Sequence, residues 1–255
     1  MRIAFLGDVH GCVKHAACVV NALDVDLAVQ VGDLGAYPSY ADLPAGDRAF
    51  VDANPSQGDI FRLLDRSLTL DAAVPILFVT GNHDNADWLG SLHDHEAVVA
   101  IDPGRAFFHV ACGKTVEFAQ LRMGFLGDIE EPEAGHGIDM TLAAGLRGVD
   151  VLVTHDGPFA LATWQGRTQG SVKVARLIAE LRPRLHVHGH YHHRNGPRRY
   201  GPTTSYGLAQ LVPPLDHNPN QEIGDGSVGI LDTTTLVFDY VPAERTAEVK
   251  VSSGN

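Results

Sequence analysis

The feature that most constrains the fold is a series of short apolar runs, each of which ends in polar residues. Between them lie segments whose apolar residues recur every three or four positions, at residues 11–23, 57–70 and 171–181. Runs that are apolar throughout are typical of parallel strands buried on both faces, and the periodic segments predict helices that cover those faces. The alternation predicts an α/β fold. The apolar runs span residues 3–7, 27–31, 75–80, 149–154 and 185–187.

Two further regions have short strand-like segments with glycine-containing turns and no long helix between them, which predicts antiparallel strands. Together with the parallel runs they predict two packed sheets of mixed direction. We expect residues 1–243 to form a single domain and the polar residues 244–255 to form a flexible tail. The long segments 34–56 and 212–226 have no clear pattern. The antiparallel segments are 107–110, 115–120, 124–127, 204–211, 227–231 and 235–240.

Composition excludes several classes of protein. Of the 255 residues, 44% are hydrophobic, which is enough for a folded core. The net charge of −12 is opposite in sign to that of a general polyanion binder. Three cysteines with no C-x-x-C pair favour neither a disulfide framework nor a zinc ribbon, and they fit a reducing cytoplasm. No apolar stretch reaches 18 residues, so we expect no membrane span. The 14 histidines make a metal site the first hypothesis to test.

Polar motifs follow the predicted parallel strands, and their donor atoms suit a metal site. In open α/β sheets, ligands bind at the carboxyl ends of the strands. Carboxylate, imidazole and amide ligands without sulfur suit Mn, Fe, Zn or Ni. Each motif alone has a simpler reading as a turn or a solvated loop, but all of them occur in order, each at a strand end. The motifs are D-V-H at residues 8–10, G-D at 32–33, G-N-H-D at 81–84, T-H-D-G-P at 154–158 and G-H-Y-H at 189–192.

This ordered set resembles the calcineurin-like metallophosphoesterase superfamily, in particular its phosphodiesterase-type branch. The resemblance implies a four-layer α/β/β/α sandwich of two mixed sheets. It also implies two divalent metal ions, with Mn favoured, and hydrolysis of a phosphodiester by a bridging hydroxide. Asp33 would bridge the two ions. The remaining ligands would be Asp8, His10 and His192 for the first ion, and Asn82, His155 and His190 for the second.

The resemblance further implies that His83 contacts the phosphate or protonates the leaving oxygen, with Asp84 orienting it. His188 precedes the G-H-Y-H motif and would lie behind the ligands. The protein serine/threonine phosphatase branch has G-D-x-V-D-R-G and G-N-H-E, neither of which occurs here, so protein phosphatase activity is not expected.

Two alternatives stay open. The first is an RNA or nucleotide phosphodiesterase related to lariat-debranching or cyclic-nucleotide enzymes, in which Tyr37, Tyr40 and Phe50 could stack a base. Core packing explains Phe50 equally well. The second is a metal-binding scaffold without catalysis, which the complete ligand set disfavours.

A basic segment follows the last ligands. No aspartate or glutamate occurs between Glu180 and Asp216, whereas several arginines do. We expect Arg194, Arg198 and Arg199 at the rim of the metal cleft, where they would bind a substrate phosphate. The alternative is a solvated basic loop. The expected partner is a phosphate ester, which includes nucleotides and RNA; the natural substrate and the oligomeric state are not predicted.

Overall fold

The first sheet has seven strands in the order β15-β14-β1-β2-β3-β5-β4. Its centre is parallel, because β1 pairs with β2, β2 with β3 and β3 with β5 in the same direction. The two strands beyond β1 and the edge strand β4 are antiparallel to their neighbours. The strands are β1 (Arg2–Leu6), β2 (Leu27–Gln30), β3 (Ile76–Phe78), β4 (Val98–Ala100), β5 (Phe107–Val110), β14 (Val228–Asp232) and β15 (Phe238–Tyr240).

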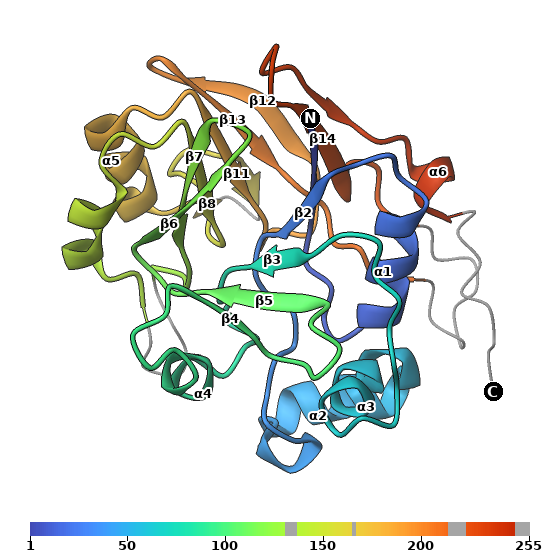
Figure 1. Cartoon of the computed structure of the whole chain (residues 1–255). Helices are drawn as coiled ribbons and strands as arrows, with labels where there is room; N and C mark the ends of the chain where they lie inside the picture. Colours follow the sequence, from blue (N-terminus) through green and yellow to red (C-terminus); the bar gives the residue numbers. More distant parts are fainter. Residues whose placement is uncertain (131–136, 165–166, 214–222, 248–255) are drawn as a thin grey trace.

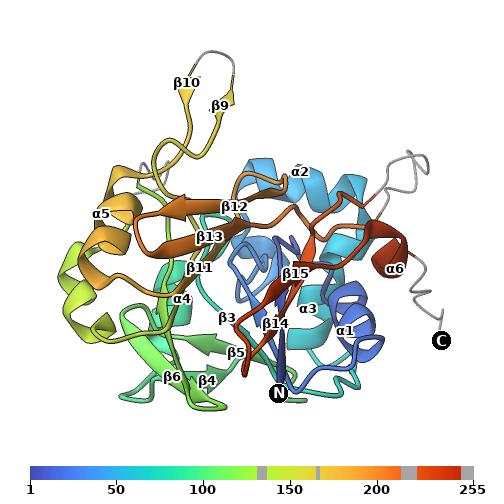
Figure 2. The same ribbon diagram turned by 90° about the horizontal axis from the view of Figure 1, so that it is seen from above.

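The second sheet has six strands in the order β12-β13-β11-β8-β7-β6. Its four central strands are parallel and both edge strands are antiparallel. A separate hairpin of β9 (Thr163–Trp164) and β10 (Arg167–Thr168) projects from the body of the molecule (Figure 2). The strands of the sheet are β6 (Lys114–Phe118), β7 (Leu121–Leu126), β8 (Val151–Thr154), β11 (Leu185–His188), β12 (Asn195–Tyr200) and β13 (Thr203–Gly207).

The two sheets pack face to face, and helices cover their outer faces (Figure 1). In β1, Ile3 and Phe5 point into the core between the sheets, whereas Ala4 and Leu6 point toward the helices. Because both faces are covered, the strand is apolar throughout. This arrangement confirms the predicted α/β/β/α sandwich of two mixed sheets. Helices α1 (Val13–Asn21) and α3 (Asp59–Leu64) cover the first sheet, and α5 (Val172–Leu181) with the 3-10 helix η3 (Met140–Leu146) covers the second.

Some predicted elements have different boundaries in the structure, and local hydrogen bonds and backbone angles explain the differences. The helix expected at residues 57–70 ends at Leu64, because the Asp65 carboxylate accepts the backbone N–H of Ser67 and Arg66 adopts a φ of 72°. The strands expected at 115–120 and 124–127 instead meet in a two-residue turn at Ala119 and Gln120, which have φ values of 49° and 67°. Two consecutive left-handed residues are typical of a type I′ hairpin turn.

The unassigned segment 34–56 contains helix α2 (Ala45–Ala53) and two short 3-10 helices, η1 (Tyr40–Asp42) and η2 (Pro55–Gly58). Helix α4 (Ala86–Ser91) follows the third sequence motif. The last helix, α6 (Ala243–Ala247), occupies the first residues of the expected tail. The single-domain organisation and the flexibility of the tail stay predictions.

The structure is a computed structural model that describes residues 1–130, 137–164, 167–213 and 223–247. Most of the unassigned segment 212–226, and residues 248–255 of the predicted tail, therefore lie outside the described residues. Within the described part of the chain, no helix is both long enough and apolar enough to cross a membrane.

Candidate metal centre

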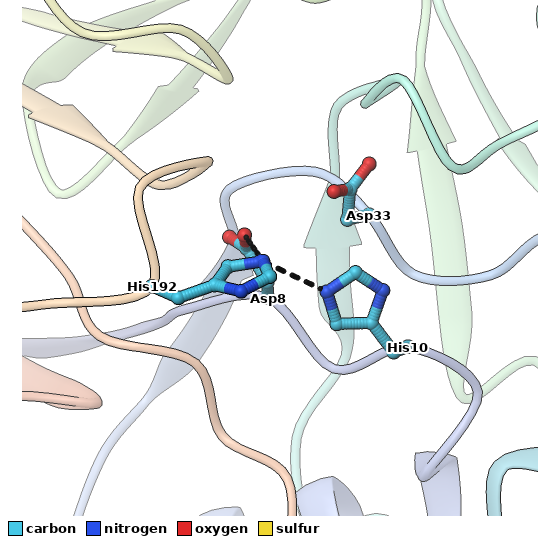
Figure 3. A group of neighbouring side chains, drawn as sticks. All are labelled: Asp8, His10, Asp33 and His192. Atoms are coloured by element: carbon cyan, nitrogen blue, oxygen red, sulfur yellow. Dashed lines mark hydrogen bonds and ion pairs between the residues drawn. The ribbon is translucent and has the colours of Figure 1, made fainter. Parts of the chain in front are cut away.

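The predicted ligands converge where strands of both sheets end. Asp8 and His10 follow β1, Asp33 follows β2, and the remaining ligands follow β3, β8 and β11. The ligand atoms form two groups, and within each group they lie within 4.8 Å of one another. Asp33 is common to both groups, as expected of a residue that bridges two ions. The first group is Asp8, His10, Asp33 and His192 (Figure 3), and the second is Asp33, His155 and His190.

In the first group, imidazole nitrogens converge on a buried carboxylate. His192 Nε2 lies 3.1 Å from Asp8 Oδ2 and 3.1 Å from His10 Nε2 (Figure 3). Asp8 is fully buried, whereas the His192 side chain is 42% exposed. Two ring nitrogens this close cannot both carry a hydrogen that points at the other. At least one of them therefore presents a lone pair, and with both rings deprotonated at these atoms the two nitrogens and the carboxylate would make a site that a cation fits.

In the second group, the ring of His155 has a fixed orientation. Its Nδ1 lies 3.0 Å from the carbonyl oxygen of Val31. A carbonyl only accepts, so Nδ1 donates and Nε2 is the atom that is free to bind a metal. Nε2 lies 3.3 Å from Asp33 Oδ2 and 3.0 Å from Asn82 Oδ1. Asn82 Oδ1 therefore lies beside the second group, and its role as a ligand stays a prediction.

Electrostatics in the second group are dominated by Asp33. Burial lowers the pKa of His155, but attraction to the Asp33 carboxylate outweighs burial and raises it to about 10. Burial raises the pKa of Asp33, and the positive charge of His155 reverses this and holds the pKa well below its usual value. The Nε2 atom of His155, which would carry this proton, is also the atom that would bind a metal. A divalent cation would replace that proton.

Asp33 has one satisfied oxygen and one that is not. Its Oδ1 accepts the backbone N–H of His83 at 2.7 Å. Its Oδ2 is buried and, beyond the charge of His155, has no hydrogen-bond partner among the described residues. An unsatisfied buried oxygen is costly, and one that lies between two groups of ligands is suited to a metal. The residues present therefore fit two divalent cations that share Asp33.

Two motif glycines make room for ligands that come from other motifs. A Cβ atom on Gly81 would overlap the Asp33 carboxylate, and one on Gly189 would overlap the Asp8 carboxylate. Neither neighbour can move, because both carboxylates are buried. The glycines of G-N-H-D and G-H-Y-H are thus required by close approach.

His83 stands beside the first ligand group, with its ring centroid 5.3 Å from that of His10. The expectation that Asp84 orients it is wrong. Asp84 accepts backbone N–H groups of Gly35 and Ala36, each at 2.8 Å, and of Gly81 at 2.7 Å. It therefore ties the loop after β2 to the loop after β3.

The carboxylate that orients His83 is Asp47, on helix α2. His83 Nδ1 lies 2.8 Å from Asp47 Oδ1. This hydrogen bond raises the pKa of His83 to about 9, against the opposing effect of burial. Sequence reasoning missed Asp47, because no local motif distinguishes it from the other acids of segment 34–56. The available signal was the length of this segment directly after Asp33.

Arg198 and Arg199 do not lie where we expected, whereas the position of Arg194 at the rim of the metal cleft stays a prediction. Arg194 bonds Asp225 at 2.7 Å, and its guanidinium lies 4.1 Å from the centre of the Tyr240 ring. Arg198 and Arg199 lie on β12, which pairs with β13 in the antiparallel direction. Their partners on β13, Ser205 and Thr204, are level with the beginning of β11. The metal ligands follow the end of β11. Along β12 the chain therefore runs away from the metal centre. Arg198 and Arg199 are near the ligands in sequence but not in space.

His188 belongs to neither ligand group. It is buried, its Nδ1 lies 3.2 Å from the carbonyl oxygen of Gly189, and its ring stacks on His186 with centroids 5.3 Å apart. It lies behind the ligands, as the sequence motif indicated.

Comparisons with known proteins bear on the family and on the fold. The family model for calcineurin-like phosphoesterases matches residues 1–194, which include all of the predicted ligands. A search of curated proteins finds no match. One similar solved structure is TT1561 of Thermus thermophilus, with a TM-score of 0.55 and 14% identity over 95% of this chain and 98% of that one. Another is GAP50, described as the anchor in the inner membrane complex of Plasmodium, with a TM-score of 0.51 and 12% identity over 99% and 86%. At these identities the likeness shows the fold alone. The family model covers well over half of the sequence, and the chain therefore belongs to the calcineurin-like phosphoesterase family.

Proposed function

We propose that the protein is a phosphodiesterase that depends on two divalent cations, with Mn²⁺ favoured. The observation that supports this most directly is Asp33, which is shared by both ligand groups and has a buried oxygen without a well-aligned hydrogen-bond donor. When bound, two such cations lower the pKa of a water and offset the charge that gathers on the phosphate. Asp8, His10 and His192 would hold one cation, and Asn82, His155 and His190 the other.

The role we propose for His83 is to donate a proton to the leaving oxygen. A carboxylate only accepts, so Asp47 fixes the proton on Nδ1 and directs Nε2 away from helix α2. The same contact raises the pKa of His83 and keeps the ring protonated near neutral pH. A positioned general acid of this kind typically contributes about 10²–10⁴-fold to the rate.

A scaffold without catalysis is the alternative of a different class. GAP50, described as the anchor in the inner membrane complex of Plasmodium, has this fold and is described by its assembly rather than by a reaction. The complete set of ligands and the hydrogen-bonded His83 favour the enzyme.

We place the enzyme in the cytoplasm, since Cys12, Cys18 and Cys112 are all free thiols.

The test compares hydrolysis of bis(4-nitrophenyl) phosphate with that of 4-nitrophenyl phosphate by chelator-treated protein. We expect no hydrolysis until Mn²⁺ is restored, and then faster turnover of the diester. Full activity without metal would contradict the proposal, and preference for the monoester would reject the diester assignment. Metal binding without hydrolysis of either ester would favour the scaffold.

A further inference from the structure

A cavity of about 300 Å³ adjoins the candidate metal centre. One side is formed by His10, His83 and His192, and the other by the segment 34–58, which we call the insert. The volume is at the lower end of the range for small-molecule sites. A phosphate held at the metal centre would therefore have one of its ester groups directed into this cavity. The lining residues from the insert are Gly35, Tyr37, Leu43, Asp47, Phe50, Val51 and Gln57.

The wall formed by the insert is apolar and unusually open to water. Helix α2 has no buried residue, although it contains Phe50 and Val51. Phe50 is 66% exposed, the highest fraction among the large exposed hydrophobic side chains of the described chain. Tyr37 and Phe61 add two more aromatic rings to the lining. Because an exposed apolar wall gains free energy when it is covered, this helix is suited to hold an apolar ring.

Two amides supply the polar groups of the cavity. Gln57 and Gln210 are among the lining residues, and no hydrogen bond joins either side-chain amide to a described residue. Each amide offers both donors and an acceptor. The carboxylate of Asp47 is already used by His83 and lies 3.4 Å from the hydroxyl of Tyr37. Among the described residues no lysine or arginine lines the cavity, so a second phosphate would find no counter-charge from them.

We propose that this cavity binds the base of a nucleoside phosphate ester. The proposal rests on the proposed function, because the phosphate of the same molecule would lie at the metal centre. The aromatic wall can stack on the flat face of a base, and the two glutamines can pair with its edge. A saturated acyl chain would cover the wall but leave both amides without partners.

The test measures direct binding by calorimetry to the Mn²⁺-loaded protein. Adenosine 5′-phosphate and ribose 5-phosphate contain the same phosphate monoester and differ in the base. A stacked base is worth about 1–3 kcal/mol, so the adenosine compound should bind about 5- to 150-fold more tightly. Equal affinities would overturn the proposal, and so would tighter binding of n-octyl phosphate. Neither ligand is a diester, so this outcome does not depend on whether the protein hydrolyses diesters.

A pair of variants locates the effect. Phe50 is largely exposed, so Phe50→Ala should fold, and the ratio of the two affinities should fall toward one. The control is Val237→Ala, in the turn between β14 and β15, which is 51% exposed and is not among the residues that line the cavity. It should keep the wild-type ratio. A wild-type ratio in Phe50→Ala, or an equal loss in both variants, would contradict the assignment of the base to this cavity.

Discussion

The metal centre and the interior of the second sheet each contain a fully buried histidine, and the pKa values of these two histidines shift in opposite directions. His155 and His186 are both fully buried. His155 faces Asp33, and its pKa rises to about 10. His186 lies between the hydroxyls of Thr154 and Ser205, at 2.7 and 2.8 Å, and burial lowers its pKa far below the usual value. Burial alone lowers the pKa of a histidine and keeps the ring neutral, whereas a carboxylate next to the ring raises the pKa and favours the charged form.

A second network of hydrogen-bonded histidines lies at the first sheet. His109 Nε2 lies 2.9 Å from the hydroxyl of Thr80, and its Nδ1 lies 2.8 Å from His93 Nε2. His93 Nδ1 in turn lies 2.8 Å from the carbonyl oxygen of Glu96. Burial lowers the pKa of His109 to about 3. These rings join segments of the chain through hydrogen bonds, and they account for part of the histidine excess without a metal.

The largest effect is expected from His192→Ala. This side chain is part of the first ligand group and is half-exposed, so its loss should remove a ligand with little change in folding. We expect the rate of diester hydrolysis to fall at least about 10³-fold, equivalent to about 4 kcal/mol.

The matched control is His193→Ala, in the same loop. The His193 ring lies 2.7 Å from the carbonyl oxygen of Tyr191 and belongs to neither ligand group. Its activity should stay within a few-fold of wild type. Similar losses of activity in both variants would mean that any change in this loop lowers the rate. The distinction between a metal-ligating and a hydrogen-bonded histidine would then fail at this position.

An intermediate effect is expected from His186→Ala. It leaves the hydroxyls of Thr154 and Ser205 without their partner and opens a cavity in a strand that is buried on both faces. We expect the free energy of unfolding in denaturant to fall by about 2–4 kcal/mol, with the metal content unchanged. Loss of bound metal at unchanged stability would place His186 with the metal centre and break the comparison.

The smallest effect is expected from Asp47→Asn, which keeps the shape of the side chain and removes its charge. The hydrogen bond from Asp47 raises the pKa of His83, and the protonated ring is the form that donates. Activity should therefore fall as pH rises through this pKa, and in the variant the fall should begin at lower pH. A shift of about one unit would reduce the rate about twofold at pH 8, and the reduction would approach about tenfold only above pH 9.

The control for this variant is Asp52→Asn, on the same helix, whose carboxylate accepts the hydroxyl of Tyr40. Its pH profile should match that of wild type. An unchanged basic limb in Asp47→Asn would show that His83 is not the group whose ionisation limits the rate.

Sequence reasoning worked where function depends on a strand and the loop directly after it. Asp8 and Asp33 follow buried apolar strands of the first sheet, and His155 follows one of the second. Parallel strands bring such residues to one edge of each sheet, and the packing of the two sheets brings these edges together. Distant parts of the chain could thus be placed together from local patterns alone.

Sequence reasoning failed where position depends on the path of the chain between elements. Asp47 reaches His83 only because helix α2 folds back over the metal centre, and no periodicity in segment 34–56 shows that path. Arg198 and Arg199 are taken away from the site by the direction of β12, which only the pairing with β13 determines. The predicted role of Asp84 was wrong because its partners are backbone N–H groups. A sequence does not show which backbone groups a side chain will meet.

The most direct measurement is a calorimetric titration of Mn²⁺ into chelator-treated protein. Asp33 is shared by two groups of buried ligands, so we predict that each chain binds two ions. Binding of a single ion, or of none, would contradict a two-cation site organised around Asp33.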